Sequence, residues 1–209
     1  MDVPQLLADL GGRFRTAAPA AARRRRAPDG PGAVAPARGT GVVVSGLTRR
    51  SVLQASACTG AAAVAGNAFV GKAAMAWFRG LDAPRRQLPL PAFLVVAALY
   101  YGVIGYVLAR SIDRRDARST AWSLAVLLGN EVWNGAFFGR RSARAGFVGL
   151  CVFVVPLVAL QRSVAEDPRS RWVLAPYTAY VLLYDLPWTH RLWRLNPAPG
   201  RARPPGPGD

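Results

Sequence analysis

Residues 127–141 read LLGNEVWNGAFFGRR, a stretch that is apolar enough to lie in a bilayer yet carries Asn130, Glu131 and Asn134 in its middle. A charged side chain exposed to lipid at mid-depth costs about 2.5–3.5 kcal/mol or more, so it needs hydrogen-bond partners inside the protein. The two amides have the same need. The stretch therefore predicts a membrane-spanning helix whose polar side chains point into a helical bundle.

Four further segments have the length and composition of membrane spans, which need about 20 mostly apolar residues. Together with the opening stretch they predict five helices, at 51–78, 88–109, 120–139, 144–162 and 172–193. The connections are short, so consecutive helices should be antiparallel neighbours. The predicted fold class is an all-α membrane protein, a bundle of five transmembrane helices. The expected location is a bacterial inner or cell membrane, which the chain crosses several times.

The tryptophans support this division into spans. Trp133 lies deep in the third predicted span, whereas the other five lie near span ends: Trp77, Trp122, Trp172, Trp188 and Trp193. An indole ring near a span end can anchor the helix at the membrane interface. We therefore interpret the five outer tryptophans as interface anchors. The position of Trp133 in the middle of a span requires a different explanation.

The basic charge of the chain flanks the predicted spans. The sequence has 27 Lys and Arg against 11 Asp and Glu, a formal net charge of +16, together with 52% hydrophobic residues. Residues 1–46 are rich in Ala, Pro and Arg, and residues 197–209 are rich in Pro and Gly, so both are predicted to be disordered tails around a membrane domain at 47–196. Arginines that interrupt apolar runs indicate contact with membrane lipid and argue against a nucleic-acid partner.

The sequence predicts no metal site, no cofactor and no catalytic residue. Cys58 and Cys151 lie in apolar runs without a C-x-x-C spacing. His190 is the only histidine, which excludes multi-histidine metal sites and histidine-based triads.

Residues 48–53, TRRSVL, allow two interpretations. They resemble a twin-arginine export signal, with cleavage after Ala76, and they also fit the basic cytoplasmic edge of a first membrane helix.

Four stretches match a known pattern in order and spacing. They are AWFRGLDAP (76–84), FLVVAALYYGVIGYVLAR (93–110), LGNEVWNGAFFGRRS (128–142) and APYTAYVLLYDLPWTHRLWRLNP (175–197). They resemble the W-Y-x-x-L-x-K-P, F-x-x-x-W-x-x-L-Y-x-x-x-G, L-N-x-x-W-x-x-x-F-F-x-x-R and P-Y-x-x-W … W-R-x-N segments of the TspO/MBR family. This family includes the bacterial tryptophan-rich sensory proteins and the mitochondrial translocator protein. The resemblance extends from Ala63 to Pro197, about two thirds of the chain.

The resemblance implies a five-helix bundle that binds a porphyrin or a similar hydrophobic aromatic molecule between its helices, for transport or stress sensing. Homodimers are common in the family. Two alternatives stay open: a membrane enzyme that degrades porphyrin, and a membrane scaffold without a ligand. The scaffold is considered because family tryptophans are replaced by Pro91, Ala97 and Tyr180. With no metal set, nucleotide loop or activated nucleophile, binding is favoured over catalysis.

Asn130, Trp133, Asn134 and Phe137 follow the spacing i, i+3, i+4 and i+7, so they are predicted to share one inward helix face. As a cavity wall, Trp133 would offer a flat surface and the amides would orient the ligand. The alternative is that the amides hold neighbouring helices together. Glu131 would either face the cavity or lie closer to the interface, near Arg140 or Arg141.

Three further residues are predicted in the site on the fifth span. Ala179 and Tyr180 match positions at which the family keeps a small residue and an aromatic residue in its pocket. Asp185 precedes Pro187, whose missing N–H should disturb the helix and admit water.

The basic N-terminal tail predicts an N-terminus inside the cell, and five spans then place the C-terminus outside. A single cysteine introduced into the C-terminal tail, in a chain lacking Cys58 and Cys151, should react with a membrane-impermeant reagent on intact cells. Labelling that requires lysis would contradict this orientation, and a mature form that begins at Trp77 would contradict the five spans.

Overall fold

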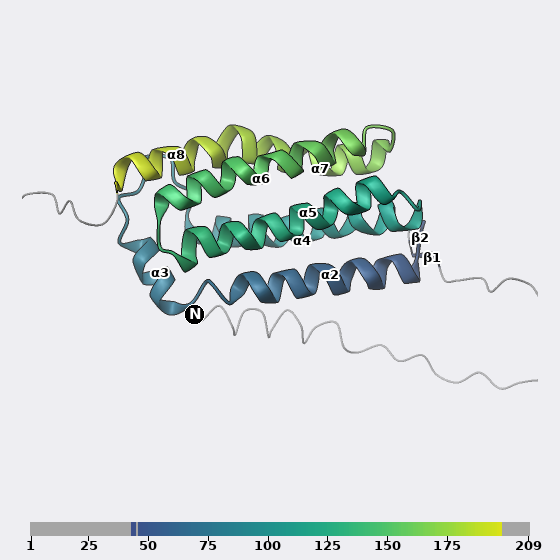
Figure 1. Cartoon of the computed structure of the whole chain (residues 1–209), viewed down its shortest axis with the longest axis horizontal. Helices are drawn as coiled ribbons and strands as arrows, with labels where there is room; N and C mark the ends of the chain where they lie inside the picture. The colour runs from purple at the N-terminus through teal and green to yellow at the C-terminus, as the bar shows by residue number, and fades with distance from the viewer. Residues whose placement is uncertain (1–42, 45, 198–209) are drawn as a thin grey trace, which may run out of the picture. The chain divides into compact units, whose positions relative to one another are not determined.

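The computed structural model describes residues 43–44 and 46–197, and the statements below concern these residues. Strands β1 (Val43–Val44) and β2 (Leu47–Thr48) form a short antiparallel pair. The helices that follow are α2 (Arg49–Asn67), α3 (Lys72–Arg79), α4 (Leu90–Asp113), α5 (Ala117–Asn134), η1 (Gly135–Gly139), α6 (Ala143–Ser163), α7 (Pro168–Tyr180), η2 (Val181–Asp185) and α8 (Leu186–Leu195), as Figure 1 shows. The described residues thus begin slightly before the predicted domain start at residue 47, and the remainder of the two predicted tails lies outside them.

Five long helical rods account for most of this part of the chain. The π-helical segment η1 continues α5, and η2 joins α7 to α8 without a break. The rods α4, α5–η1, α6 and α7–η2–α8 overlap the second to fifth predicted spans, and α2 covers only the first part of the first predicted span. Among the described helices, α4 and α6 are long and apolar enough to cross a membrane, by length and composition.

The first predicted span is interrupted, which the sequence interpretation did not foresee. We predicted one helix over 51–78, whereas α2 ends at Asn67 and α3 begins at Lys72. The Asn67 side chain donates a hydrogen bond to the Ala63 carbonyl (2.8 Å), and Phe69 in the turn lies over Gly135 and Gly139 of η1. The missing side chains of these two glycines leave room for the Phe69 ring and so fix the turn against η1.

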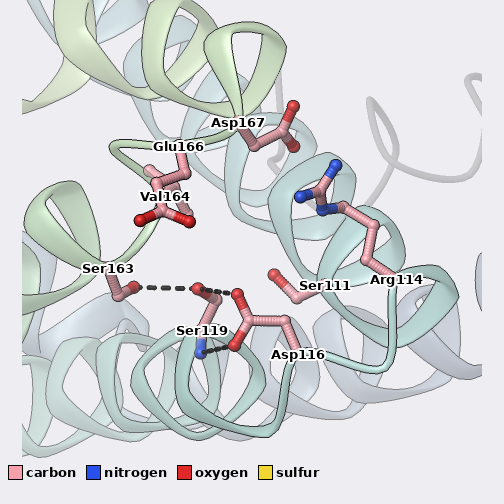
Figure 2. A pocket seen from close by; sticks show the side chains of 8 residues that line it. All are labelled: Ser111, Arg114, Asp116, Ser119, Ser163, Val164, Glu166 and Asp167. Carbon is pink, nitrogen blue, oxygen red and sulfur yellow. Dashed lines mark hydrogen bonds between the residues drawn. The ribbon is translucent and has the colours of Figure 1, made fainter.

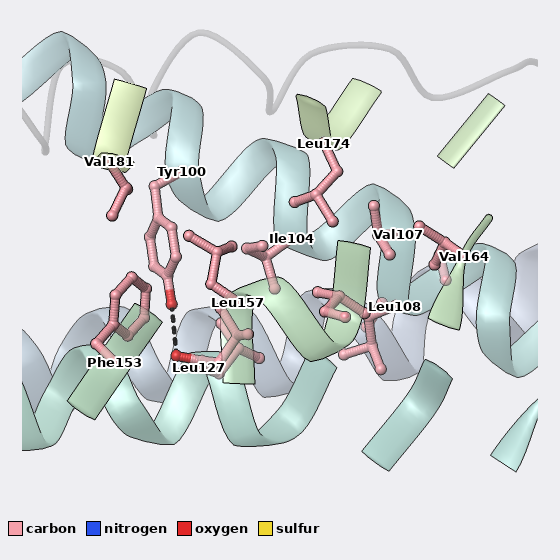
Figure 3. Packing of buried hydrophobic residues seen from close by; sticks show 14 of the residues in the cluster. Tyr100, Ile104, Val107, Leu108, Leu127, Phe153, Leu157, Val164, Leu174 and Val181 are labelled. Atoms are coloured by element: carbon pink, nitrogen blue, oxygen red, sulfur yellow. Dashed lines mark hydrogen bonds between the residues drawn. The ribbon is translucent and has the colours of Figure 1, made fainter. Parts of the chain in front are cut away.

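The main core lies between α4, α5, α6 and α7 (Figure 3). Buried side chains recur at helical spacing along α4, and the Tyr100 hydroxyl donates a hydrogen bond to the Val126 carbonyl of α5 (3.1 Å). Other faces of the same helices expose large apolar side chains: Leu94, Val95, Leu99, Leu124, Leu128, Val132, Val148, Val152 and Val155. Apolar residues on both faces are expected for helices that contact lipid.

A polar network joins the α4–α5 and α6–α7 connections. Arg110 forms a bidentate ion pair with Asp167 (2.7 and 2.8 Å), and the Ser170 hydroxyl donates to the same carboxylate (2.6 Å). Asp116 caps the start of α5 by accepting a hydrogen bond from the Ser119 N–H (3.0 Å). Figure 2 shows the small polar cavity beside this network, lined by Ser111, Arg114, Asp116, Ser119, Ser163, Val164, Glu166 and Asp167. Its volume of about 40 Å³ is room for a few water molecules.

Replacing Asp167 by Asn should destabilise the fold in a pH-dependent way. The hydrogen bonds from Arg110 and Ser170 and the Arg110 charge lower the pKa of the Asp167 carboxyl to about 2. Because this pKa lies below the ordinary value of about 3.9, the ion pair stabilises the fold above about pH 4 and loses its effect as the pH falls from about 4 towards 2.

Unfolding in detergent should therefore show Asp167→Asn less stable by about 2 kcal/mol at pH 7, with the difference shrinking below about pH 3. Glu166→Gln is the matched control, because Glu166 is the exposed neighbour of Asp167, and it should leave stability unchanged. A pH-independent effect of Asp167→Asn would rule out the ion pair as the cause.

Candidate functional site

Seven aromatic rings gather at the end of the bundle formed by α3, η1 and α8. This aromatic cluster consists of Trp77, Phe78, Phe93, Trp133, Phe137, Phe138 and Trp188. Phe137 is its centre, only 1% exposed, with five other rings of the cluster at 4.8–6.4 Å between centroids. Trp133 lies parallel to Phe137, at 5.3 Å and an interplanar angle of 9°. The two rings form one flat stack, and most other pairs in the cluster meet edge to face.

Glycines on α6 provide the space for this stack. A side chain at Gly146 would overlap the Phe137 ring, and one at Gly149 would press against Trp133. The Trp133 indole N–H also donates a hydrogen bond to the Gly146 carbonyl (2.9 Å). The stack is therefore held against α6 both by shape and by a hydrogen bond.

The four residues predicted to share one face of α5 are divided between two neighbouring helices. Trp133 packs on α6, whereas Asn134 lies against Gly66 of α2. Trp133 and Asn134 are adjacent in sequence, and adjacent side chains on a helix point in directions that differ by about 100°. The π-turn of η1, in which Arg140 N–H bonds to the Gly135 carbonyl, then changes the direction of Phe137. The predicted single face is thus wrong for the amides, while Trp133 and Phe137 do lie together.

A separate polar group surrounds Glu131, which is only 8% exposed. Its Oε1 accepts hydrogen bonds from the Tyr101 hydroxyl (2.9 Å) and the Asn130 amide (3.1 Å), and its Oε2 accepts one from the Asn134 amide (3.2 Å). Within the described part of the chain Glu131 forms no ion pair, so the predicted alternative of Arg140 or Arg141 as its partner is wrong. Asn130 and Asn134 hold this carboxylate in place.

A column of tyrosines runs from this group along the fifth rod. Centroid distances between neighbours in the order Tyr101, Tyr100, Tyr177, Tyr180 and Tyr184 are 4.9, 5.2, 6.4 and 5.3 Å. Tyr180, a predicted site residue, therefore belongs to this tyrosine column.

The other two residues predicted on the fifth span have different surroundings. The predicted irregularity before Pro187 is present as the π-turn η2, closed by a hydrogen bond from the Leu186 N–H to the Val181 carbonyl. Asp185 ends this turn. Ala179 is exposed on α7, so the structure does not bring it together with the other predicted site residues.

Trp188 and Gln87 were missed by the sequence interpretation. Trp188, taken as an interface anchor, is 5% exposed and packs on Phe93 at 5.1 Å. Its indole nitrogen and the Gln87 side-chain oxygen are buried, and neither has a hydrogen-bond partner among the described residues. The four-residue spacing between Tyr184 and Trp188, which places both on one helix face, is the signal that could have indicated an inward position.

The family model described as "TspO/MBR family" matches residues 55–186, well over half of the chain. The chain belongs to the TspO/MBR family. A comparison with curated proteins finds no match. Family membership makes the chain an integral membrane protein, in agreement with the apolar helices α4 and α6.

Gly66→Ala should lower the stability of the protein because a side chain at this position would overlap the Glu131 carboxylate and crowd the Asn134 amide. Gly60→Ala on the same helix is the matched control, since nothing lies within 4 Å of the added carbon. Thermal unfolding in detergent should show Gly66→Ala destabilised by about 1–3 kcal/mol and Gly60→Ala unchanged or stabilised by up to about 1 kcal/mol. Equal effects of the two changes would mean that α2 and Glu131 are not in close contact.

Proposed function

We propose that this protein crosses the membrane several times and binds a tetrapyrrole, or a similar flat aromatic molecule, at the aromatic cluster, for transport or stress sensing. The observation that carries the proposal is the parallel stack of Trp133 and Phe137 within a group of seven rings. Aromatic faces bind a planar macrocycle by stacking and by burial of apolar area. Family membership supports a ligand of this class.

The predicted site residues take different parts in this proposal. Trp133, which is half-buried, would provide the stacking surface, and the buried Phe137 ring would support it from behind. Asn130 and Asn134 act indirectly, because their amides are engaged with Glu131 and hold α5 in register with α4 and α2. Tyr180 and Asp185 would line the approach along α7 and η2, and Ala179 contributes only if the ligand extends to the outer side of α7.

The proposal also includes the lipid around the bundle and a second copy of the protein. The outward apolar side chains of α4, α5 and α6 would contact lipid. A homodimer, which is common in the family, remains a proposal, to be tested by the mass of the purified protein in detergent.

Trp133→Ala should weaken porphyrin binding by about ten-fold or more. Stacking contributes roughly 0.5–1.5 kcal/mol beyond the buried area, the lost contact area adds to it, and about 1.4 kcal/mol corresponds to a factor of ten. Trp133→Phe should lose less affinity because it keeps a ring. The measurement is a titration of the purified protein with protoporphyrin IX, followed by the absorbance of the porphyrin.

Trp122→Phe is the control, because Trp122 packs against the main core outside the aromatic cluster, and it should bind like the unchanged protein. Thermal unfolding of each variant separates loss of binding from misfolding. If Trp133→Ala folds and binds porphyrin normally, the ligand does not use this stack. Light-dependent product formation by the purified protein would instead favour the enzyme.

A further inference from the structure

The end of the bundle that holds the aromatic cluster carries a large surplus of positive charge. This aromatic end consists of residues 72–89, 135–147 and 186–197, which have nine basic side chains and one acid, Asp82. Among the described residues, the one ion pair joins Arg110 and Asp167 at the opposite end, so no carboxylate contacts the charges of the aromatic end. All nine basic side chains are exposed: Lys72, Arg79, Arg85, Arg86, Arg140, Arg141, Arg144, Arg191 and Arg194.

The nine charges belong to segments that pack against one another. Trp77 of α3 lies on Phe137 of η1 (5.3 Å between centroids), and Phe147 near the start of α6 stacks on Trp193 of α8 (5.5 Å). The Asn196 side chain, just after α8, bonds a backbone N–H and a backbone carbonyl of the α3–α4 segment (2.9 and 3.0 Å). The nine basic side chains therefore surround one end of the bundle, the end at which Figure 1 shows α3 and α8. We call these nine side chains the basic collar.

The basic collar lies where the apolar helices end. Val148, exposed on α6, follows Arg144 by four residues, and Leu94, exposed on α4, follows Arg86 by eight. Four residues of helix rise about 6 Å. The headgroup layer on each side of a membrane is about 5–8 Å deep, and a long basic side chain can extend towards it from an apolar surface. With the outward apolar side chains of α4 and α6 among the lipid tails, the collar lies at the level of the lipid phosphates.

Two arginine pairs show how the two ends of the bundle differ. Residues 113–116 in the α4–α5 connection read DRRD, whereas residues 139–142 in the connection from η1 to α6 read GRRS. The backbones are alike, because the second arginine of each pair, Arg115 and Arg141, has a positive φ, of 55° and 48°. Acids flank the first pair and cancel part of its field, whereas no acid flanks the second. Two adjacent guanidinium groups without acids suit a phosphate, which accepts charge-assisted hydrogen bonds from both.

We propose that the basic collar binds the phosphate groups of anionic phospholipids, with the pair Arg140 and Arg141 as its main contact. A lipid of net negative charge is attracted by the collar as a whole. In a zwitterionic lipid, the cationic part of the headgroup offsets the attraction of the phosphate. Bound lipid would hold α3 and the turn between η1 and α6 at the membrane interface. The lipid binds on the outer surface, independently of any ligand at the aromatic cluster.

The test uses the full-length protein in vesicles that contain brominated phosphatidylglycerol, with one net negative charge, or brominated phosphatidylcholine, with none. Quenching of tryptophan fluorescence gives the relative affinity of the two lipids. Phosphatidylglycerol should bind about ten-fold or more tightly, since each basic side chain near the surface adds to the attraction. This preference should shrink in about 1 M salt, which screens charges beyond about 3 Å. Combining Arg140→Gln with Arg141→Gln should weaken phosphatidylglycerol binding about ten-fold and leave phosphatidylcholine binding unchanged.

Arg114→Gln combined with Arg115→Gln is the matched control at the opposite end, and it should leave the preference for phosphatidylglycerol nearly unchanged. Thermal unfolding in detergent without lipid shows whether each variant folds. If the variant at 140 and 141 does not fold, Arg191→Gln combined with Arg194→Gln on α8 takes its place, with the same expected loss. Equal affinity for the two lipids, or an equal loss in the variants at the two ends, would overturn the proposal. Displacement of the lipid by inorganic phosphate would also overturn it, because the site would then bind the free ion.

Discussion

A carboxylate enclosed by apolar helices has to be met by hydrogen-bond donors, and around Glu131 this requirement decides how α2, α4 and α5 pack. Tyr101 reaches it from α4, and the two amides reach it from α5 itself. Helix α2 approaches closely because position 66 is a glycine, and α2 ends one residue later. The turn that follows is held on η1 by Phe69, which brings α3, with Trp77 and Phe78, onto Phe137. The hydrogen bonds around Glu131 therefore fix the position of α2. The turn after α2 then positions α3 in the aromatic cluster.

The two ends of the described bundle are equally rich in basic residues but differ in how these are neutralised. Residues 46–50, 110–120 and 161–171 carry nine basic side chains and four acids. There Asp167 pairs with Arg110, Asp116 caps α5 and Asp113 accepts a hydrogen bond from the Thr48 hydroxyl, so three of the four acids have defined partners. The end with the aromatic cluster has the same number of basic residues but a single acid. Its charge is left largely uncompensated, and its polar atoms at Trp188 and Gln87 are left unpaired. The first end is built for stability, whereas the second keeps both charge and hydrogen-bonding capacity free.

The helical rods could be predicted because the length of an apolar run is a strong signal, and the helices lie where the five runs are. The interruption between α2 and α3 escaped prediction because it depends on a contact between Phe69 and η1 that is distant in sequence. The pairing of Trp133 with Phe137 was foreseen from helical spacing. The placement of Asn134 beside them was not correct, since a uniform spacing cannot anticipate π-turns or show which neighbouring helix each side of α5 meets. Trp188 was misjudged for a similar reason: a tryptophan near a span end indicates an interface anchor until the segment that covers it is known.

The structure shows what surrounds a residue that replaces a family tryptophan. The family tryptophan within the second helix is Ala97 here, whereas the one on the fifth helix is Tyr180, which belongs to the tyrosine column. Several of its hydroxyls link separate elements, with Tyr100 bonded to Val126, Tyr101 to Glu131 and Tyr184 to the segment between α3 and α4. A tyrosine engaged in this way stabilises the bundle but has its hydroxyl group occupied. Trp188 is the contrasting case, because its ring is buried while its N–H is unengaged. The tyrosine column therefore joins neighbouring helices through its hydroxyls, whereas the Trp188 N–H has no partner among the described residues.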